Sequence, residues 1–199
     1  MRQESRPNGW NARSHRALAA LLAIGAAMIA SAATVSIHRR LEDRRHGWSS
    51  RAAWIWYARA GKKPAPLRFW AERDVTIGRV PERVEARFLV DPEFTLFVNG
   101  RRVVSGSGRP GDAMRAIDLA QDLRPGLNRI LIEASSPDGI GGILFLAEGV
   151  GLDPAAFDSG ARWRVALDPG ELERGQGRPA IVWGRPPQYP WGYPRPPEP

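Results

Sequence analysis

Residues 94–104 read Phe-Thr-Leu-Phe-Val-Asn-Gly-Arg-Arg-Val-Val, and this stretch decides the fold class. Two β-prone runs flank Asn99-Gly100, a dipeptide that favours a type I′ turn because both of its residues tolerate a positive φ. The stretch therefore predicts a tight antiparallel hairpin in which Phe94–Val98 pairs with Arg101–Val104.

Short apolar runs separated by turn residues continue on both sides of this hairpin. From Val84 to Val90 apolar residues alternate with charged ones, which is typical of a half-buried strand. Pro125-Gly126 predicts a turn that leads into another strand, whereas the glycines of Ser105–Ala113 make that segment too irregular to pair. Strands at this spacing predict an all-β sandwich or barrel. The other expected strands are 53–57, 67–71, 75–77, 129–133, 143–147 and, as the last one, 163–167.

An uncharged segment of 21 residues, Ala17–Ile37, precedes this domain. As a helix it would be about 31 Å long, which matches the hydrocarbon core of a bilayer. We therefore expect a transmembrane anchor; a cleaved signal peptide ending at Ala30-Ser31-Ala32 is the alternative. Arg39 and Arg40 would directly follow such a cut, which is unusual for a signal peptide. Arginines flank both ends of the segment, so charge does not set its orientation.

The expected organisation of the chain follows from these features. The Pro-rich C-terminal segment is expected to pack in part on the sandwich and then fray, and a ligand for an SH3-like groove is the alternative. The parts are a basic N-terminal tail at 1–16, the transmembrane anchor at 17–37, a charged juxtamembrane linker at 38–50, the β-sandwich at 51–184 and the Pro-rich tail at 185–199.

The composition excludes several classes of function. The net charge is +8, but residues 1–47 hold eight arginines against three acidic residues, and the remaining charges are interspersed. No basic stripe could follow a phosphate backbone, so nucleic acid is not an expected partner. The chain has no cysteine, and His15, His38 and His46 all precede the domain. The domain is therefore not expected to build a thiolate site, a His-ligated zinc site or a Ser-His triad.

A series of landmarks runs in order along residues 50–192. They are Ala53-Trp54-Ile55-Trp56, Phe69-Trp70-Ala71, the strand into Asn99-Gly100, Ile117-Asp118-Leu119, Pro125-Gly126-Leu127-Asn128, Gly142-Ile143-Leu144, Asp158 with Trp163-Arg164, and Pro190-Trp191-Gly192. In this order they resemble the galactose-binding-like jelly-roll accessory domains of bacterial alpha-L-rhamnosidases and beta-galactosidase-like glycosidases. The resemblance implies a galactose-binding-like jelly-roll β-sandwich that meets glycans outside the cytoplasm. Because the sequence lacks the catalytic barrel that accompanies such domains, the resemblance implies a module and not an enzyme.

The function expected from this reading is carbohydrate binding by a module on a membrane anchor. Its partner would be a glycan or a glycan-processing protein. Such sites place an exposed aromatic ring against a sugar and use polar or charged side chains for its hydroxyls. The candidate ligand-binding residues are Trp70 and Trp191 as platforms, with Arg109, Asp112 and Asp138 as polar contacts. The alternative for the tryptophans is core packing, and for Arg109 and Asp112 a solvated loop.

Two other functions fit the sequence less well. A structural or protein-docking subunit of an envelope complex would use the sandwich surface and the Pro-rich tail. A small glycosidase would need two carboxylates that flank one bond, and Glu133 and Glu148 are the candidates. No cofactor is expected, since no motif indicates a metal site, and a structural Ca²⁺ ion held by loop oxygens remains an alternative.

Overall fold

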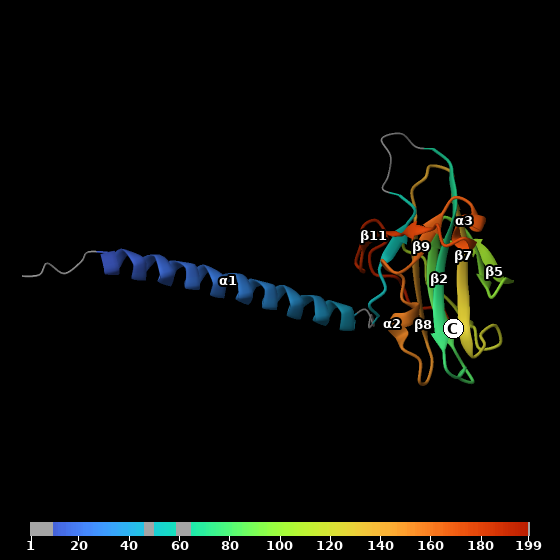
Figure 1. Ribbon diagram of the computed structural model, residues 1–199, viewed down its shortest axis with the longest axis horizontal. Coiled ribbons are helices and arrows are strands. Elements are labelled where there is room, and N and C mark those ends of the chain that lie inside the picture. Colours follow the sequence, from blue (N-terminus) through green and yellow to red (C-terminus); the bar gives the residue numbers. More distant parts are fainter. Residues whose placement is uncertain (1–9, 46–49, 59–64, 199) are drawn as a thin grey trace, which may run out of the picture. The chain divides into compact units, whose positions relative to one another are not determined.

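Alternating apolar side chains arrange the strands into two antiparallel sheets in this computed structural model, which describes residues 10–45, 50–58 and 65–198 (Figure 1). The strands are β1 Trp54–Trp56, β2 Leu67–Ile77, β3 Glu85–Asp91, β4 Glu93–Val98, β5 Arg101–Ser107, β6 Arg115–Asp118, β7 Gly126–Ser136, β8 Gly142–Glu148, β9 Arg164–Ala166, β10 Arg178–Pro179 and β11 Ile181–Gly184. The helices are α1 Trp10–Arg45, α2 Pro154–Phe157 and α3 Pro169–Glu173.

The two sheets form one sandwich around a shared core. One sheet has the order β11-β1-β8-β3-β6 and the other the order β10-β9-β2-β7-β4-β5. The long strands β2 and β7 pair in register from Leu67↔Ser136 to Ile77↔Gly126 and lie side by side in Figure 1. Between the sheets, Phe69, Phe88, Phe145 and Trp163 are fully buried. The all-β sandwich expected from the strand spacing is confirmed.

The hairpin between β4 and β5 has the predicted turn. Asn99 has a φ of 51° and Gly100 a φ of 81°, so both central residues are in the left-handed region that a type I′ turn requires. Val98 pairs with Arg101 and Phe97 with Arg102. Leu96 then pairs with Val104, so a bulge shifts the register between Phe97 and Leu96.

Gly100→Val is expected to lower the free energy of unfolding by about 1–3 kcal/mol, because a β-branched residue is strained at positive φ. A Cβ at this position would meet nothing within 4 Å, so backbone conformation and not a clash would cause the loss. Thermal unfolding measures the effect. Gly78→Val is the matched control, since Gly78 is equally open and its φ is not positive. Equal melting temperatures for the two variants would contradict the prediction.

Two expectations about strands are wrong. Ser105, Gly106 and Ser107 do not belong to an irregular loop, because they continue β5 and pair with Thr95, Phe94 and Glu93. A Cβ at Gly106 would lie 2.7 Å from the Arg115 guanidinium, so a glycine at this position leaves room for that side chain. The last strand is also not at 163–167, since β10 pairs with β9 and β11 pairs with β1.

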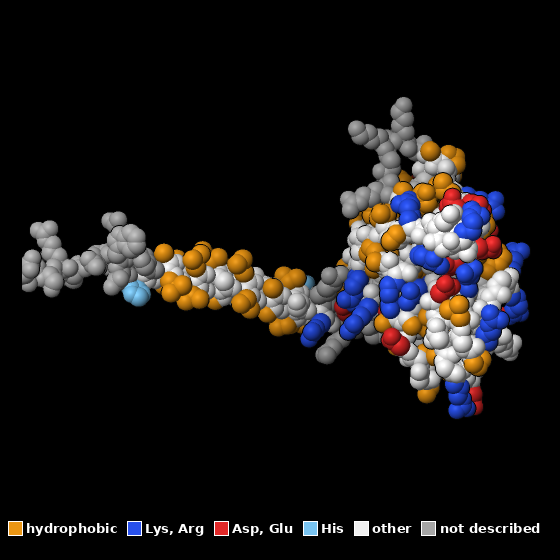
Figure 2. All heavy atoms as spheres, viewed as in Figure 1, with side chains coloured by type: hydrophobic (Ala, Val, Ile, Leu, Met, Phe, Trp, Pro, Cys, Tyr) orange, Lys and Arg blue, Asp and Glu red, His pale blue; other side chains and the backbone are white. Residues whose placement is uncertain are grey.

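Helix α1 contains the predicted anchor and extends beyond it in both directions. Its segment from His15 to Asp43 is long and apolar enough to cross a membrane. Apolar side chains appear along the helix in Figure 2, and Leu21, Leu22 and Ile29 are each at least 65% exposed. Residues 38–45 of the predicted linker are helical, while residues 1–9 and 46–49 lie outside the described residues.

The Pro-rich segment packs on the sandwich and is called the strap here, defined as residues 185–198. It starts beside β11, and Trp191 then stacks on Trp54 of β1 with ring centroids 4.5 Å apart. Further along, the Met114 N–H donates to the Arg195 carbonyl (3.0 Å) just before β6. Because β11 and β6 are opposite edges of the five-stranded sheet, the strap crosses that sheet. Residues 185–198 of the tail therefore pack on the sandwich, and they belong to the same compact unit as its strands.

Candidate functional site

The two sheets differ in what covers their outer faces. The strap lies over the five-stranded sheet, whose outward-facing Trp54, Leu89 and Leu144 are buried. On the six-stranded sheet, α3 packs on one part through the buried Leu172, next to β2 and β9. The part of this sheet formed by the Leu67 end of β2 and its neighbours carries polar side chains, and it is the candidate site.

Strand register brings eight side chains of this part into two rows, which we call the polar face. One row crosses β2, β7, β4 and β5, because Trp70 pairs with Glu133, Glu133 with Thr95, and Thr95 with Ser105. Successive residues of a strand point to opposite faces, so positions two residues away form the second row. The polar face consists of Trp70, Glu133, Thr95 and Ser105 in the first row and Arg68, Ser135, Glu93 and Ser107 in the second.

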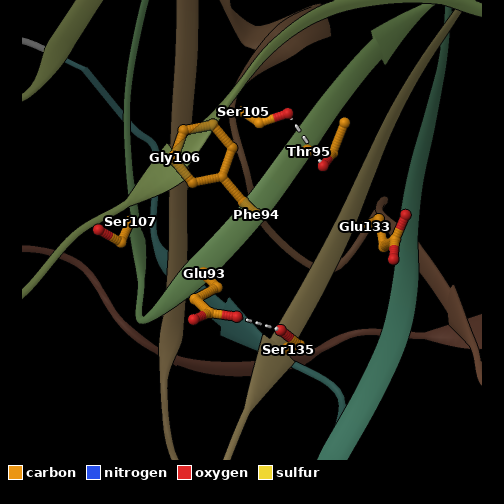
Figure 3. Close-up of a pocket in the computed structure, with 8 residues that line it drawn as sticks. All are labelled: Glu93, Phe94, Thr95, Ser105, Gly106, Ser107, Glu133 and Ser135. Atoms are coloured by element: carbon orange, nitrogen blue, oxygen red, sulfur yellow. Dashed lines mark hydrogen bonds between the residues drawn. The ribbon is translucent and has the colours of Figure 1, made fainter.

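Hydrogen bonds fix several of these side chains in place. Figure 3 shows the Ser135 hydroxyl directed at the Glu93 carboxylate (3.0 Å) and the Ser105 hydroxyl directed at that of Thr95 (3.1 Å). Arg68 donates from Nε to Oε1 of Glu133 (2.6 Å), and its guanidinium carbon lies 5.4 Å from the Trp70 ring centroid. The face therefore presents hydroxyls, carboxylates and one half-buried indole in a defined arrangement.

Two shallow hollows lie on the polar face and share Glu93 and Ser135. One has a volume of about 410 Å³ and lies between Glu133 and β5 (Figure 3). The other has a volume of about 460 Å³ and lies between Glu93 and Arg68. Because they adjoin, a linear ligand could lie across both, and each has a volume typical of a small-molecule site.

The structure separates the two predicted aromatic platforms. Trp70 lies on the polar face and is half-buried. Trp191 is only 5% exposed, because its ring stacks on Trp54 and its Nε1–H donates to Oδ2 of Asp91 (2.9 Å). The expectation of an exposed ring at Trp191 is therefore wrong, and core packing, the alternative, describes this residue.

The three predicted polar contacts lie in loops at one end of the sandwich. Asp112 accepts a hydrogen bond from the backbone N–H of Arg109 (2.8 Å), so its carboxylate closes its own turn. Asp138 accepts from the Ile140 N–H (3.0 Å) and the Ser136 hydroxyl (2.8 Å), and these bonds lower the pKa of Asp138. The side chain of Arg109 is exposed. Sequence and structure together explain both aspartates as loop formers.

A third carboxylate, Asp91, links these loops to the strap. Burial raises the pKa of Asp91, and repulsion from Asp138 and Asp112 adds to this effect, while the hydrogen bond from Trp191 opposes it. Of the predicted site residues, Trp191 thus contacts Asp91 and the charges of Asp112 and Asp138 act on it, whereas Trp70 belongs to the polar face. In the parts of the chain that the structure describes, no group of three His, Cys, Asp or Glu residues could hold a metal ion.

The two carboxylates considered for glycosidase chemistry do not form a pair. Glu133 lies on β7 of the six-stranded sheet, whereas Glu148 lies on β8 of the five-stranded sheet and pairs with Arg87 (2.8 Å). A catalytic pair must flank one bond in a common cleft, and these residues belong to different sheets.

Sequence reasoning missed most residues of the polar face, although a signal was present. Glu93 and Thr95 alternate with the buried Phe94 and Leu96, which marks them as outward-facing. The rows themselves depend on the pairing of β4 with β7, whose residues are about 40 positions apart in the sequence.

The β-sandwich resembles parts of several solved structures. No protein-family model matches the sequence, and no curated protein matches it. An alpha-L-rhamnosidase from Streptomyces avermitilis, solved with L-rhamnose, is 21% identical over 73% of this chain and 16% of its own, with a TM-score of 0.60. A GH78 family rhamnosidase of Bacillus sp. GL1 is 21% identical over 74% of this chain and 20% of its own, also with a TM-score of 0.60.

A lectin from Pleurotus ostreatus matches as well, with 20% identity over 72% of this chain and 46% of its own and a TM-score of 0.55. A second structure of that lectin, in complex with GalNAc, has a TM-score of 0.52. The folded unit is a galactose-binding-like β-sandwich. At these identities the likeness is one of fold, and the chain spans a fifth or less of the two rhamnosidases and less than half of the lectin.

Proposed function

We propose that the chain is a membrane-anchored carbohydrate-binding module without catalysis of its own, and that the polar face of its galactose-binding-like sandwich holds the glycan. The observation that carries this proposal is the pair of cross-strand rows that includes Trp70, on a sheet face that the strap does not cover. The lectin and rhamnosidase likenesses support a carbohydrate ligand.

The chemistry of the polar face suits a neutral glycan. The carboxylates of Glu93 and Glu133 accept hydrogen bonds from sugar hydroxyls, and Ser107 and Ser135 can donate or accept. The indole of Trp70 offers an apolar surface against which a sugar ring can pack. Two carboxylates disfavour an acidic sugar, because like charges would be brought together.

The membrane part of the proposal assigns residues 17–37 of α1 to the bilayer and the sandwich to the extracytoplasmic side. Support comes from the length and apolar character of the helix and from the location of glycans outside the cytoplasm. Nucleic acid is not part of the proposal, because arginine and acidic side chains lie close together on the face of the sandwich seen in Figure 2.

Calorimetry and glycan arrays on the full chain in detergent test the binding function. We expect a dissociation constant on the order of 10 μM to 1 mM, as a shallow site with one ring and a few polar contacts allows. Glu93→Ala is expected to weaken binding about tenfold, which corresponds to about 1.4 kcal/mol, without a change in melting temperature. Trp70→Ala is expected to abolish detectable binding.

The double variant Arg109→Ala with Asp112→Ala is the matched comparison at the loop end of the sandwich, and it is expected to leave binding unchanged. Loss of binding in this variant alone would move the site to the predicted loop residues. Absence of glycan binding by the wild-type chain, together with recovery of a stoichiometric protein partner from membranes, would replace the carbohydrate function by protein docking.

A further inference from the structure

The chain enters the sandwich at the end opposite to the polar face. The Ser50 hydroxyl donates to Oδ1 of Asp158 (3.1 Å), and the Arg51 N–H donates to Oδ2 of the same carboxylate (3.1 Å). Asp158 directly follows α2, which lies beside β8. These bonds hold the entry point next to the loops at the Ile77 end of β2, whereas Arg68 and Trp70 of the polar face lie at its Leu67 end.

This entry end carries a hollow that is larger than either hollow of the polar face. It has a volume of about 830 Å³ and is formed by the β2–β3 loop, the β8–α2 loop and α2. Val150, at the tip of the β8–α2 loop between two glycines, is 93% exposed. Apolar side chains dominate the lining, namely Ile77, Val80, Pro81, Val150, Leu152 and Phe157.

Four charged residues surround this hollow, two of each sign. Arg79 and Arg83 are exposed, and Arg83 pairs with Glu85 (2.8 Å). Glu82 is exposed, and Asp153 caps α2 by accepting from the Ala155 N–H (3.0 Å). An exposed aliphatic tip surrounded by mixed charges suits the headgroup region of a phospholipid bilayer, where apolar atoms sink in and charges stay hydrated.

The length of the connection to the anchor limits the distance between this end and a bilayer. From Ile37 to Arg45 the helix rises about 12 Å, and the five residues from Arg45 to Ser50 reach at most about 18 Å, whatever their arrangement. The strand β2, with 11 residues, is about 36 Å long. The whole connection, at most about 30 Å, is thus shorter than the sandwich is long. Of the two ends of the sandwich, the entry end is therefore the one that can rest on the membrane.

We infer that the entry end of the sandwich docks on the phospholipid surface in which α1 is anchored, with Val150 in the headgroup region and the polar face directed away from the bilayer. This inference rests on the proposed membrane anchor. It assigns the apolar hollow to lipid and explains how a glycan site stays accessible on a short tether.

The experiment uses the full chain reconstituted into phosphatidylcholine–phosphatidylglycerol liposomes. Because the chain has no cysteine, Val150→Cys can be labelled uniquely with an environment-sensitive dye. Pro137→Cys, exposed at the opposite end of the sandwich, is the matched control. Nitroxide-labelled lipid is expected to quench the dye at residue 150 at least about twofold more than the dye at residue 137, because nitroxide quenching requires proximity to the lipid.

A second pair of variants tests whether Val150 drives the docking. A dye at Glu82→Cys, on the neighbouring loop, is expected to be quenched, and adding Val150→Asp is expected to remove that quenching. If the chain resists carbonate extraction while residues 150 and 137 are quenched equally, the end-on docking is wrong and the anchor stands. If carbonate releases the chain, the membrane anchor itself is wrong.

Discussion

Glu72→Ala is expected to lower the free energy of unfolding by about 1.5–3 kcal/mol, because it removes the buried carboxylate from an ion-pair network whose two arginines are about one-third exposed. Glu72 lies on β2 and is 1% exposed. Its Oε2 lies 3.1 Å from Nε of Arg129 on β7, and its Oε1 pairs with Arg164 on β9. Without this carboxylate, two guanidinium groups would share only Asp74, which lies 3.3 Å from Arg129 and 3.5 Å from Arg164.

Chemical unfolding followed by tryptophan fluorescence measures this loss. Glu85→Ala is the matched control, since it removes a carboxylate from an exposed ion pair with Arg83 and is expected to cost less than about 1 kcal/mol. Glu72→Gln keeps the shape and loses the charge, so its effect should lie between the two. A loss for Glu72→Ala no larger than that of Glu85→Ala would mean that the network does not hold β9 to β2.

Trp191→Ala is expected to cost about 3–5 kcal/mol, as large-to-small changes of buried aromatic residues do. The variant would remove the ring that stacks on Trp54 and the N–H that donates a hydrogen bond to Asp91. Its direct readout is exposure of the five-stranded sheet, measured by binding of a hydrophobic dye and by thermal unfolding. An unchanged melting temperature would show that the strap is not required for stability.

Trp191→Phe separates the stacking from the hydrogen bond and adds a pH dependence. Losing the N–H donor raises the pKa of Asp91 further, since that bond stabilises the charged carboxylate and burial opposes it. A group with a raised folded-state pKa binds its proton more tightly in the folded protein, so stability falls as pH rises through that pKa. The loss of stability in Trp191→Phe relative to wild type should therefore be larger at about pH 7 than at about pH 4. An equal deficit at both pH values would contradict the role of this bond.

Local signals in the sequence predicted local structure well. Asn99-Gly100 predicted its turn because the requirement for positive φ concerns those two residues alone. The Pro-Gly-Leu-Asn landmark also has a local cause, since the buried Asn128 accepts from the Arg124 N–H (2.8 Å) and donates to the Arg124 carbonyl (2.7 Å). The order of such motifs was sufficient for the galactose-binding-like fold.

Features that depend on distant pairings could not be predicted in the same way. The Trp-Arg landmark marked Arg164, but its partner Glu72 becomes apparent only when β9 lies beside β2. Trp191 was expected as a sugar platform because the residues around it in the sequence do not show that the strap crosses a sheet. The polar face required the register of four strands, including the bulge between β4 and β5.

The position of the strap in the sequence has a consequence for biosynthesis. Residues 185–198 leave the ribosome after all strands of both sheets, so the strands can pair while the outer side of the five-stranded sheet is still uncovered. Until Trp191 arrives, Trp54, on which its ring stacks, would be open to solvent, to chaperones and to other nascent chains. A stalled or nicked product ending near Gly184 would keep that surface exposed, and quality-control proteases could recognise it as unfinished.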